Sequence, residues 1–238
     1  MKKVTVMAAV VMAAMNVNAQ ARFGVQAGVN FASTQVEQYN QVTRITEEKN
    51  TSSNTGATFG FLADLPIVET LSFMPELNYV QKGYEFQNTT GNIVAKEKAK
   101  FHYVEVPLNF VVKTDVGMGK FFFGLGPSVG FGLTGTQERS LTGAGNGFDF
   151  NRKIDVDFDG EADAPVEQAH YKRMDLGANA LAGYMFSNGL FFKVNYTYGF
   201  RNLYPDNAAP NDKDTFKTRG LSLKLGYMLG GNNNNDND

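Results

Sequence analysis

Three aspartates at alternate positions form the most ligand-like pattern in this sequence. Asp155, Asp157 and Asp159 precede a glycine, and alternate carboxylates with a glycine at the sixth position are typical of an EF-hand calcium loop. That loop needs a glutamate at its twelfth position, where this chain has Val166, one residue before Glu167. No flanking helices are evident. We therefore favour a strand with its carboxylates in water, and calcium binding remains the alternative. The apolar residues on the other side of that strand would be Ile154, Val156 and Phe158.

The two histidines, His102 and His170, are the next candidates for chemistry. Paired with Ser128 or Ser140, either could act as the base of a hydrolase. No nucleophile motif surrounds the serines, however, and no residue is spaced to orient an imidazole. We predict that the protein is not an enzyme, that it has no catalytic, cofactor-binding or metal-binding residue, and that both histidines lie near strand ends.

Charged residues also recur inside otherwise apolar stretches. They share the polar side of an alternating pattern and are Glu76, Glu105, Lys113, Asp175, Lys193, Arg201 and Lys224. Such a set could form a proton or ion path. We favour ion pairs that fill and stabilise the interior of a barrel.

Residues 173–201 indicate which elements hold these side chains. Apolar and polar residues alternate strictly on both sides of a turn at 187–189, as in β-strands with one apolar and one polar face. A three-residue loop with Gly189 at the positive-φ position keeps both faces aligned. The resulting pairs are Phe186 with Leu190, Tyr184 with Phe192, Leu176 with Phe200, and Asp175 with Arg201, whose opposite charges support the register.

The same alternation predicts eight strands. The expected ranges are 22–33, 56–64, 70–86, 101–113, 119–135, 173–186, 190–201 and 218–229. Long connections (34–55, 87–100, 136–170 and 204–217) alternate with short ones (65–69, 114–118 and 187–189). Even strand numbers, short periplasmic turns and long outer loops are typical of bacterial outer-membrane barrels. The polar face of 119–135 is mostly glycine, which would leave room for large side chains across a narrow lumen.

The length of the strands and the charges on their polar faces indicate where the apolar faces point. Strands of roughly 9–11 residues or more can cross a bilayer when tilted. Charged side chains that face inward fit poorly with the apolar cavity of a barrel that binds a small apolar ligand. The sequence therefore predicts an all-β fold, an eight-stranded antiparallel up-and-down transmembrane β-barrel. Eight strands enclose an interior that side chains can fill, so no open pore is expected. The alternative is a secreted soluble lipocalin-like barrel that binds a small apolar ligand.

The N-terminus has the order of features of a secretory signal peptide. Lys2 and Lys3 precede an apolar run and then small residues, so residues 1–19 are interpreted as a signal peptide. Cleavage is expected after Ala19, with Ala21 as the alternative. Residues 20–229 would then form the outer-membrane barrel domain.

Composition narrows the remaining possibilities. The chain has no cysteine, which excludes disulfides and a lipoprotein anchor. Its net charge of −2 gives no argument for nucleic acid. Residues 230–238 are rich in Asn and Asp, and we interpret them as a disordered polar tail.

Several short motifs resemble one family in their order along the chain. They are 75–79 (PELNY), 81–83 (QKG), 103–108 (YVEVPL), 124–127 (GLGP) and 220–228 (GLSLKLGYM). Together they resemble the porin-family, PorT-like outer-membrane barrels of Bacteroidetes. The resemblance implies that fold and a location in the outer membrane of a Gram-negative bacterium, but no substrate. Members of that family commonly stop at the last strand, from which this chain departs.

These observations predict a small integral outer-membrane protein with a structural or surface-interaction role through its long outer loops. Its partners would be outer-membrane lipid and an extracellular or periplasmic protein, and the barrel would be a monomer. Besides the soluble barrel, a second alternative is an outer-membrane enzyme that modifies lipid.

Overall fold

The computed structural model describes residues 21–40, 43–49, 51–143, 149–161, 168–205 and 214–229. The expected signal peptide and the polar tail lie outside these residues, as do Val166 and Glu167 of the calcium pattern. The described strands are β1 (Arg22–Asn40), β2 (Ile45–Lys49), β3 (Ser52–Val68), β4 (Leu71–Thr90), β5 (Ile93–Val116), β6 (Gly119–Gly143), β7 (Asp149–Asp157), β8 (Gln168–His170), β9 (Met174–Phe186), β10 (Leu190–Gly199) and β11 (Thr215–Leu229). Within this part of the chain, no helix is long and apolar enough to cross a membrane.

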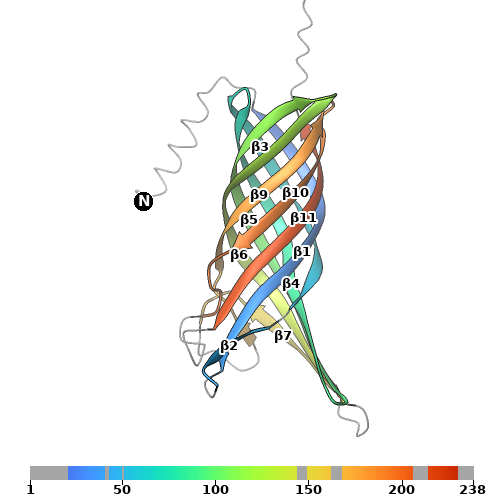
Figure 1. Ribbon diagram of the computed structural model, residues 1–238, viewed down its shortest axis with the longest axis vertical. Helices are drawn as coiled ribbons and strands as arrows, with labels where there is room; N and C mark the ends of the chain where they lie inside the picture. The colour runs from blue at the N-terminus through green and yellow to red at the C-terminus, as the bar shows by residue number, and fades with distance from the viewer. Residues whose placement is uncertain are drawn as a thin grey trace, which may run out of the picture.

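Eight of these strands close into a ring. Apart from β2, β7 and β8, the strand order is β5-β4-β3-β1-β11-β10-β9-β6, and pairing of β5 with β6 completes the circle. Each ring strand pairs antiparallel with its neighbours, and the first strand pairs with the last. Figure 1 shows these strands tilted around one long axis. The predicted eight-stranded antiparallel up-and-down barrel is confirmed.

The predicted register of the β9–β10 hairpin is confirmed over most of its length. Tyr184 pairs with Phe192, and Gly189 has the expected positive φ of 89°. The pairing of Asp175 with Arg201 is wrong, because β10 ends at Gly199. The Asp175 carboxylate instead lies 2.9 Å from the Lys82 ammonium. Closing the barrel supplies a partner from across the lumen that a hairpin considered alone cannot reveal.

Three of the four long connections expected from the sequence contain strands, namely 34–55, 87–100 and 136–170. β4 and β5 pair as far as Thr90 and Ile93, so the expected loop 87–100 contains only a tight turn with Gly91 at a φ of 60°. The expected loop 34–55 contains the end of β1, all of β2 and the start of β3. Charged residues interrupt the hydrophobic alternation in these segments, but the backbone hydrogen bonds of the ladder continue. We call the sheet formed by residues 85–98, 138–143 and 149–154 the arm; it projects beyond the barrel (Figure 1, lower right).

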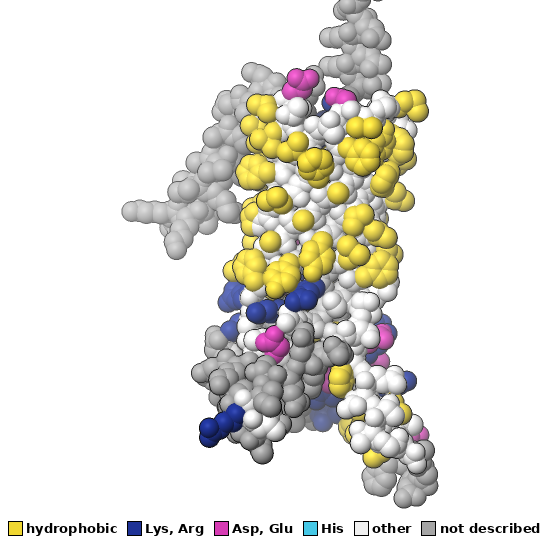
Figure 2. Space-filling view, viewed as in Figure 1, with side chains coloured by type: hydrophobic (Ala, Val, Ile, Leu, Met, Phe, Trp, Pro, Cys, Tyr) yellow, Lys and Arg dark blue, Asp and Glu magenta, His cyan; other side chains and the backbone are white. Residues whose placement is uncertain are grey.

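Apolar side chains cover the outside of the barrel. Phe61, Leu125 and Leu225 are 64%, 71% and 65% exposed, and Figure 2 shows a band of apolar side chains that ends at a row of Lys and Arg near the loops. The alternating neighbours point into the lumen and are buried. This is the arrangement of a lipid-embedded barrel. The soluble lipocalin-like alternative is therefore wrong, because its apolar side chains would face inward.

Two apolar clusters close the interior. The turn-end cluster, near the short turns, contains Leu62, Met74, Val111, Phe122, Leu181, Met185, Phe191 and Met228. The loop-end cluster contains Val36, Tyr84, Ala99, Phe101, Tyr103, Val156, Phe158, Tyr171, Leu203 and Phe216. The expected use of glycine is confirmed at Gly132, where an added Cβ would lie 2.4 Å from the Phe158 ring.

Candidate functional site at the loop end

Buried ion pairs occupy the lumen between the two clusters. Lys193 lies 2.6 Å from the carboxylate of Glu76, and Lys224 lies 3.7 Å from its other oxygen. Gln26 and Asn78 also donate hydrogen bonds to Glu76, at 2.8 and 3.0 Å. All of these side chains are buried. The carboxylate therefore has the charged and polar partners that a buried ion needs.

A second group balances the first. Lys82 lies 2.5 Å from Glu105 and 2.9 Å from Asp175. One carboxylate beside two lysines and one lysine beside two carboxylates give three charges of each sign. In this matched set every charge has a partner, so removing one of them would leave an uncompensated buried charge.

A third ion cluster lies close to the short turns. Asp64 is fully buried and lies 2.7 Å from Arg22 and 2.5 Å from Lys113. Six of the seven charged residues predicted to face the lumen are buried there, and the exception is Arg201, which lies beyond the end of β10. Lys82 was missed, although it shares its face with Glu76 through the even spacing of β4.

The loop-end cluster is built from aromatic rings that meet edge to face. The ring of Phe101 lies 5.4 to 6.2 Å from those of Tyr84, Phe158, Tyr171 and Phe216. Such edge-to-face and tilted contacts are favourable beyond the area they bury. The cluster forms a rigid apolar floor just below the loops.

A pocket of about 320 Å³ opens above this floor. It is lined by Val36, Thr51, Tyr84, Phe86, Glu97, Gln137, Arg139, Tyr171 and Tyr204. Gln137 and Arg139 follow one another on the inward face of β6, in a segment expected to be a loop. Sequence reasoning missed this pocket. The available signal was the alternation that continues from Tyr103 and Phe101 through Ala99 to Glu97.

Glu97 organises the polar side of the pocket. One of its oxygens accepts hydrogen bonds from the Tyr84 hydroxyl and the Gln137 amide, both at 2.5 Å. Its other oxygen lies 3.3 Å from Nε of Arg139. Burial and the nearby carboxylates of Asp214 and Glu97 raise the pKa of Tyr204 to about 12, so this phenol stays neutral at physiological pH.

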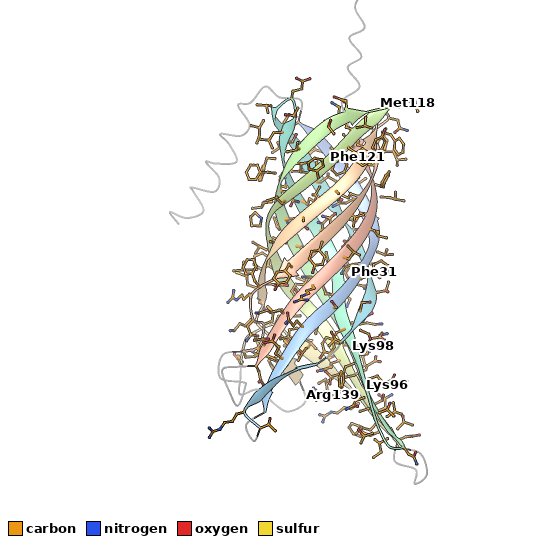
Figure 3. The ribbon with its side chains drawn as sticks, in the orientation of Figure 1. Phe31, Lys96, Lys98, Met118, Phe121 and Arg139 are labelled. Carbon is orange, nitrogen blue, oxygen red and sulfur yellow. The ribbon has the colours of Figure 1, made fainter. Side chains whose placement is uncertain are left out.

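The inner face of the arm is apolar toward its tip and carries Arg139 and Arg152 nearer the barrel, whereas its outer face is charged. On the inner face, Ile93, Leu141 and Phe150 are 54%, 45% and 49% exposed, and Leu141 pairs across the sheet with Phe150. The outer face carries Lys96 and the ion pair between Lys98 and Glu85. Figure 3 shows Lys96, Lys98 and Arg139 along this projection.

The aspartates of the calcium pattern do not converge. Asp155 and Asp157 lie on β7, while Val156 and Phe158 point the other way into the loop-end cluster. Asp159 accepts hydrogen bonds from the Glu161 amide at 3.0 Å and contacts Nδ1 of His170 at 2.8 Å. Although desolvation opposes them, these contacts hold the Asp159 pKa below its usual value. Within the described residues, no group of three or more His, Asp or Glu side chains could hold a metal ion.

The structure does not bring the suggested hydrolase residues together. His102 lies on the outer face of β5, where its ring contacts the Tyr79 hydroxyl. Ser128 is buried on the lumen face of β6, so the barrel wall separates it from His102. Ser140 lies on the arm, and His170 is engaged by Asp159.

Comparisons with known proteins agree with this architecture. The family described as outer membrane protein beta-barrel domain matches residues 15–204. The chain belongs to this family, and its place is the outer membrane of a Gram-negative bacterium. No curated protein matches the sequence significantly.

Similar solved structures include three outer-membrane or surface proteins. OprG of Pseudomonas aeruginosa is 11% identical, with a TM-score of 0.45, and the match covers 90% of this chain and 98% of that one. The Neisserial surface protein A is 12% identical, with a TM-score of 0.41, and the match covers 87% of this chain and 97% of that one. The attachment invasion locus protein Ail of Yersinia pestis is 11% identical, with a TM-score of 0.38, and the match covers 88% of this chain and 99% of that one.

Proposed function

We propose that the barrel is a monomeric anchor that holds the arm and the loop-end pocket outside the cell for binding. In this proposal the protein neither catalyses a reaction nor conducts solutes. The observation that carries the proposal is the arm, whose inner face has exposed apolar side chains toward its tip, far from the lipid-facing band.

The exposed side chains of the arm favour a protein partner. Ile93, Leu141 and Phe150 come from three adjacent strands, β5, β6 and β7. Exposed apolar side chains that adjoin one another, with charges around them, commonly mark interaction sites. The charged outer face keeps the arm soluble, so binding is expected on the inner face.

The filled interior supports a role without transport. Apolar clusters lie toward both ends of the lumen, and paired charges lie between them. The proposal therefore expects no steady ionic current when the purified protein is inserted into a planar bilayer. A stable single-channel conductance would contradict this part.

Photo-crosslinking on intact cells tests the arm directly. A photoreactive amino acid at Leu141 should give a discrete crosslinked product with a partner protein. The same substitution at Lys96, on the opposite face of the arm, is the matched control and should give little product. Equal products at the two positions, or none at Leu141, would contradict the proposed binding face.

The second alternative, an enzyme that modifies lipid, has no support among the described residues because His102 and Ser128 face opposite sides of the wall.

We also propose that the chain belongs to the PorT-like barrels of Bacteroidetes. The motifs at 75–79 and 103–108 support this proposal, and they occupy paired strands of the barrel. An alignment in which PorT-like barrels share no more of these two motifs than other outer-membrane barrels would contradict it.

A further inference from the structure

We propose that the loop-end pocket binds one neutral sugar ring, a pyranose. The inference rests on the proposed function only in placing this pocket outside the cell. It does not depend on whether the arm binds a protein.

The first observation is an unused hydrogen-bond acceptor in the pocket wall. Gln137 is 1% exposed, and its Nε2 donates to Glu97 at 2.5 Å and to the Tyr84 hydroxyl at 3.2 Å. A carboxylate accepts but does not donate hydrogen bonds, so this contact fixes which end of the amide is nitrogen. Oε1 of Gln137 has no partner among the described residues. This oxygen is itself buried, and an unpaired buried acceptor is unfavourable, so a ligand hydroxyl that reached it would satisfy it.

The second observation is the charge balance. The carboxylate of Glu97 is already paired with Arg139 and receives two further hydrogen bonds. The other residues that line the pocket are neutral, including Tyr204 with its raised pKa. A charged ligand would therefore meet no uncompensated opposite charge. A neutral ligand with several hydroxyls would suit the unpartnered oxygen of Gln137, which is buried beside the pocket, and the remaining N–H donors of Arg139, which is 56% exposed at the rim.

The third observation is the aromatic wall. The rings of Tyr171 and Tyr204 are stacked, with centroids 6.2 Å apart and an angle of 21° between their planes. Tyrosine combines an apolar face with a polar tip. A pyranose has the matching shape, because its C–H groups form an apolar face and its hydroxyls form a polar edge. The volume of about 320 Å³ lies at the lower end of the range for ligand pockets, which suits one ring.

Saturation-transfer NMR on the purified full-length protein tests the proposal. The probes are the methyl pyranosides of glucose, galactose and mannose, and the micelle is a detergent without a sugar headgroup. At least one probe should show saturation transfer to its ring C–H protons. Gln137→Leu should weaken binding about tenfold, as expected for the loss of one hydrogen bond of roughly 1.4 kcal/mol.

Two further variants guard against a trivial loss of fold. Tyr204→Leu keeps an apolar side chain but removes an aromatic face, so it should also weaken binding. Gln35→Leu, on the outer face of β1 at the same end of the barrel, is the matched control and should bind as the wild type does. Heat-dependent gel mobility confirms that each variant is folded. The absence of saturation transfer to any neutral pyranoside would overturn the proposal. So would folded Gln137→Leu and Tyr204→Leu variants that bind the pyranoside as tightly as the wild type does.

Competition identifies the source of the sugar. Displacement of the bound pyranoside by purified lipopolysaccharide would support the proposal and assign the site to glycans of the same membrane. Continued binding in its presence would support the proposal with soluble sugars as the ligand. The NMR experiment uses purified protein, in which both ends of the barrel are accessible. A failure to bind pyranosides would therefore count against the pocket alone, whereas a failure of crosslinking on cells would count against the proposed function of the arm.

Discussion

The turn-end and loop-end clusters are both buried and apolar, yet they leave very different amounts of space. The turn-end cluster is built from Leu, Met, Val and Phe, and the cavity beside it is only about 10 Å³. The loop-end cluster is mostly Tyr and Phe, and it forms the floor of a pocket of about 320 Å³. Methionine fills irregular gaps; the turn-end cluster contains three methionines and the loop-end cluster contains none. One end is sealed, and the other closes the barrel while leaving room for a ligand.

The ion layer between the clusters gives the largest expected effect. Replacing Glu76 with Leu leaves Lys193 and Lys224 buried without their carboxylate. We expect a loss of about 3–5 kcal/mol in the free energy of unfolding, measured by urea titration in lipid vesicles. The double variant Glu76→Leu with Lys193→Met should recover part of this loss. A stability equal to that of the wild type would show that the barrel does not depend on the ion pairs of Glu76.

The lipid-facing surface gives the next effect. Leu223 is 45% exposed on β11, and Leu223→Arg should cost about 2–4 kcal/mol if it lies near the middle of the bilayer. Its neighbour Ser222 points inward and donates a hydrogen bond to Asn30 at 2.8 Å. Ser222→Ala should cost about 1 kcal/mol. Equal tolerance of the two changes in the same unfolding assay would contradict the assigned faces.

Two matched glycine variants test the difference between the clusters. In Gly132→Ala the new methyl would lie 2.4 Å from the ring of Phe158 in the loop-end cluster. In Gly183→Ala it would lie 2.4 Å from the backbone carbonyl oxygen of Phe192 and 2.5 Å from the ring of Phe122 in the turn-end cluster. Gly132→Ala should lose about 1–3 kcal/mol in the free energy of unfolding, because overpacking displaces the ring. Gly183→Ala should lose at least as much, because the Phe192 carbonyl belongs to the backbone and moves less easily than a side chain.

The functional effects of the two glycine variants should differ. Only Gly132→Ala should change pyranoside binding, because Phe158 supports the floor of the pocket. If both variants changed binding equally, the two ends of the lumen would not act separately.

The smallest effect concerns pH at the loop end. The folded-state pKa of Asp159 is lowered. The contribution of its carboxylate to stability is therefore present above the unfolded pKa of about 3.9 and is lost as pH falls through the lower folded pKa. Amide hydrogen exchange at residues 157–161 should therefore increase in acid, relative to β9, and Asp159→Asn should show this increase already at neutral pH. Unchanged protection in the variant would contradict this role.

The sequence was sufficient where the two faces of a strand differ strongly. The alternation around Tyr184 and Phe192 predicted both the strands and their register, since the turn at Gly189 permits one alignment of the faces. Six of the seven charges that it placed on the lumen face are buried there. The partner of Asp175 could not be predicted in this way, because Lys82 lies 93 positions away and reaches it only after the barrel closes.

The candidate site was much harder to predict. Gln137 and Arg139 lie in a segment where charges on the outer face interrupt the hydrophobic pattern, so that segment was expected to be a loop. The free oxygen of Gln137 depends on three side chains from different strands. Such an arrangement is a property of packing, and no local spacing of residues reports it.

Accessibility labelling on intact cells tests most directly whether the sealed end faces the periplasm and the open end faces the outside. The chain has no cysteine, so Ile93→Cys on the arm and Met118→Cys at a short turn each introduce a single thiol. A maleimide attached to a bulky polymer that cannot cross the outer membrane should label Ile93→Cys in intact cells, and Met118→Cys only after the membrane is permeabilised. Labelling of Met118→Cys in intact cells, with Ile93→Cys protected, would contradict the account.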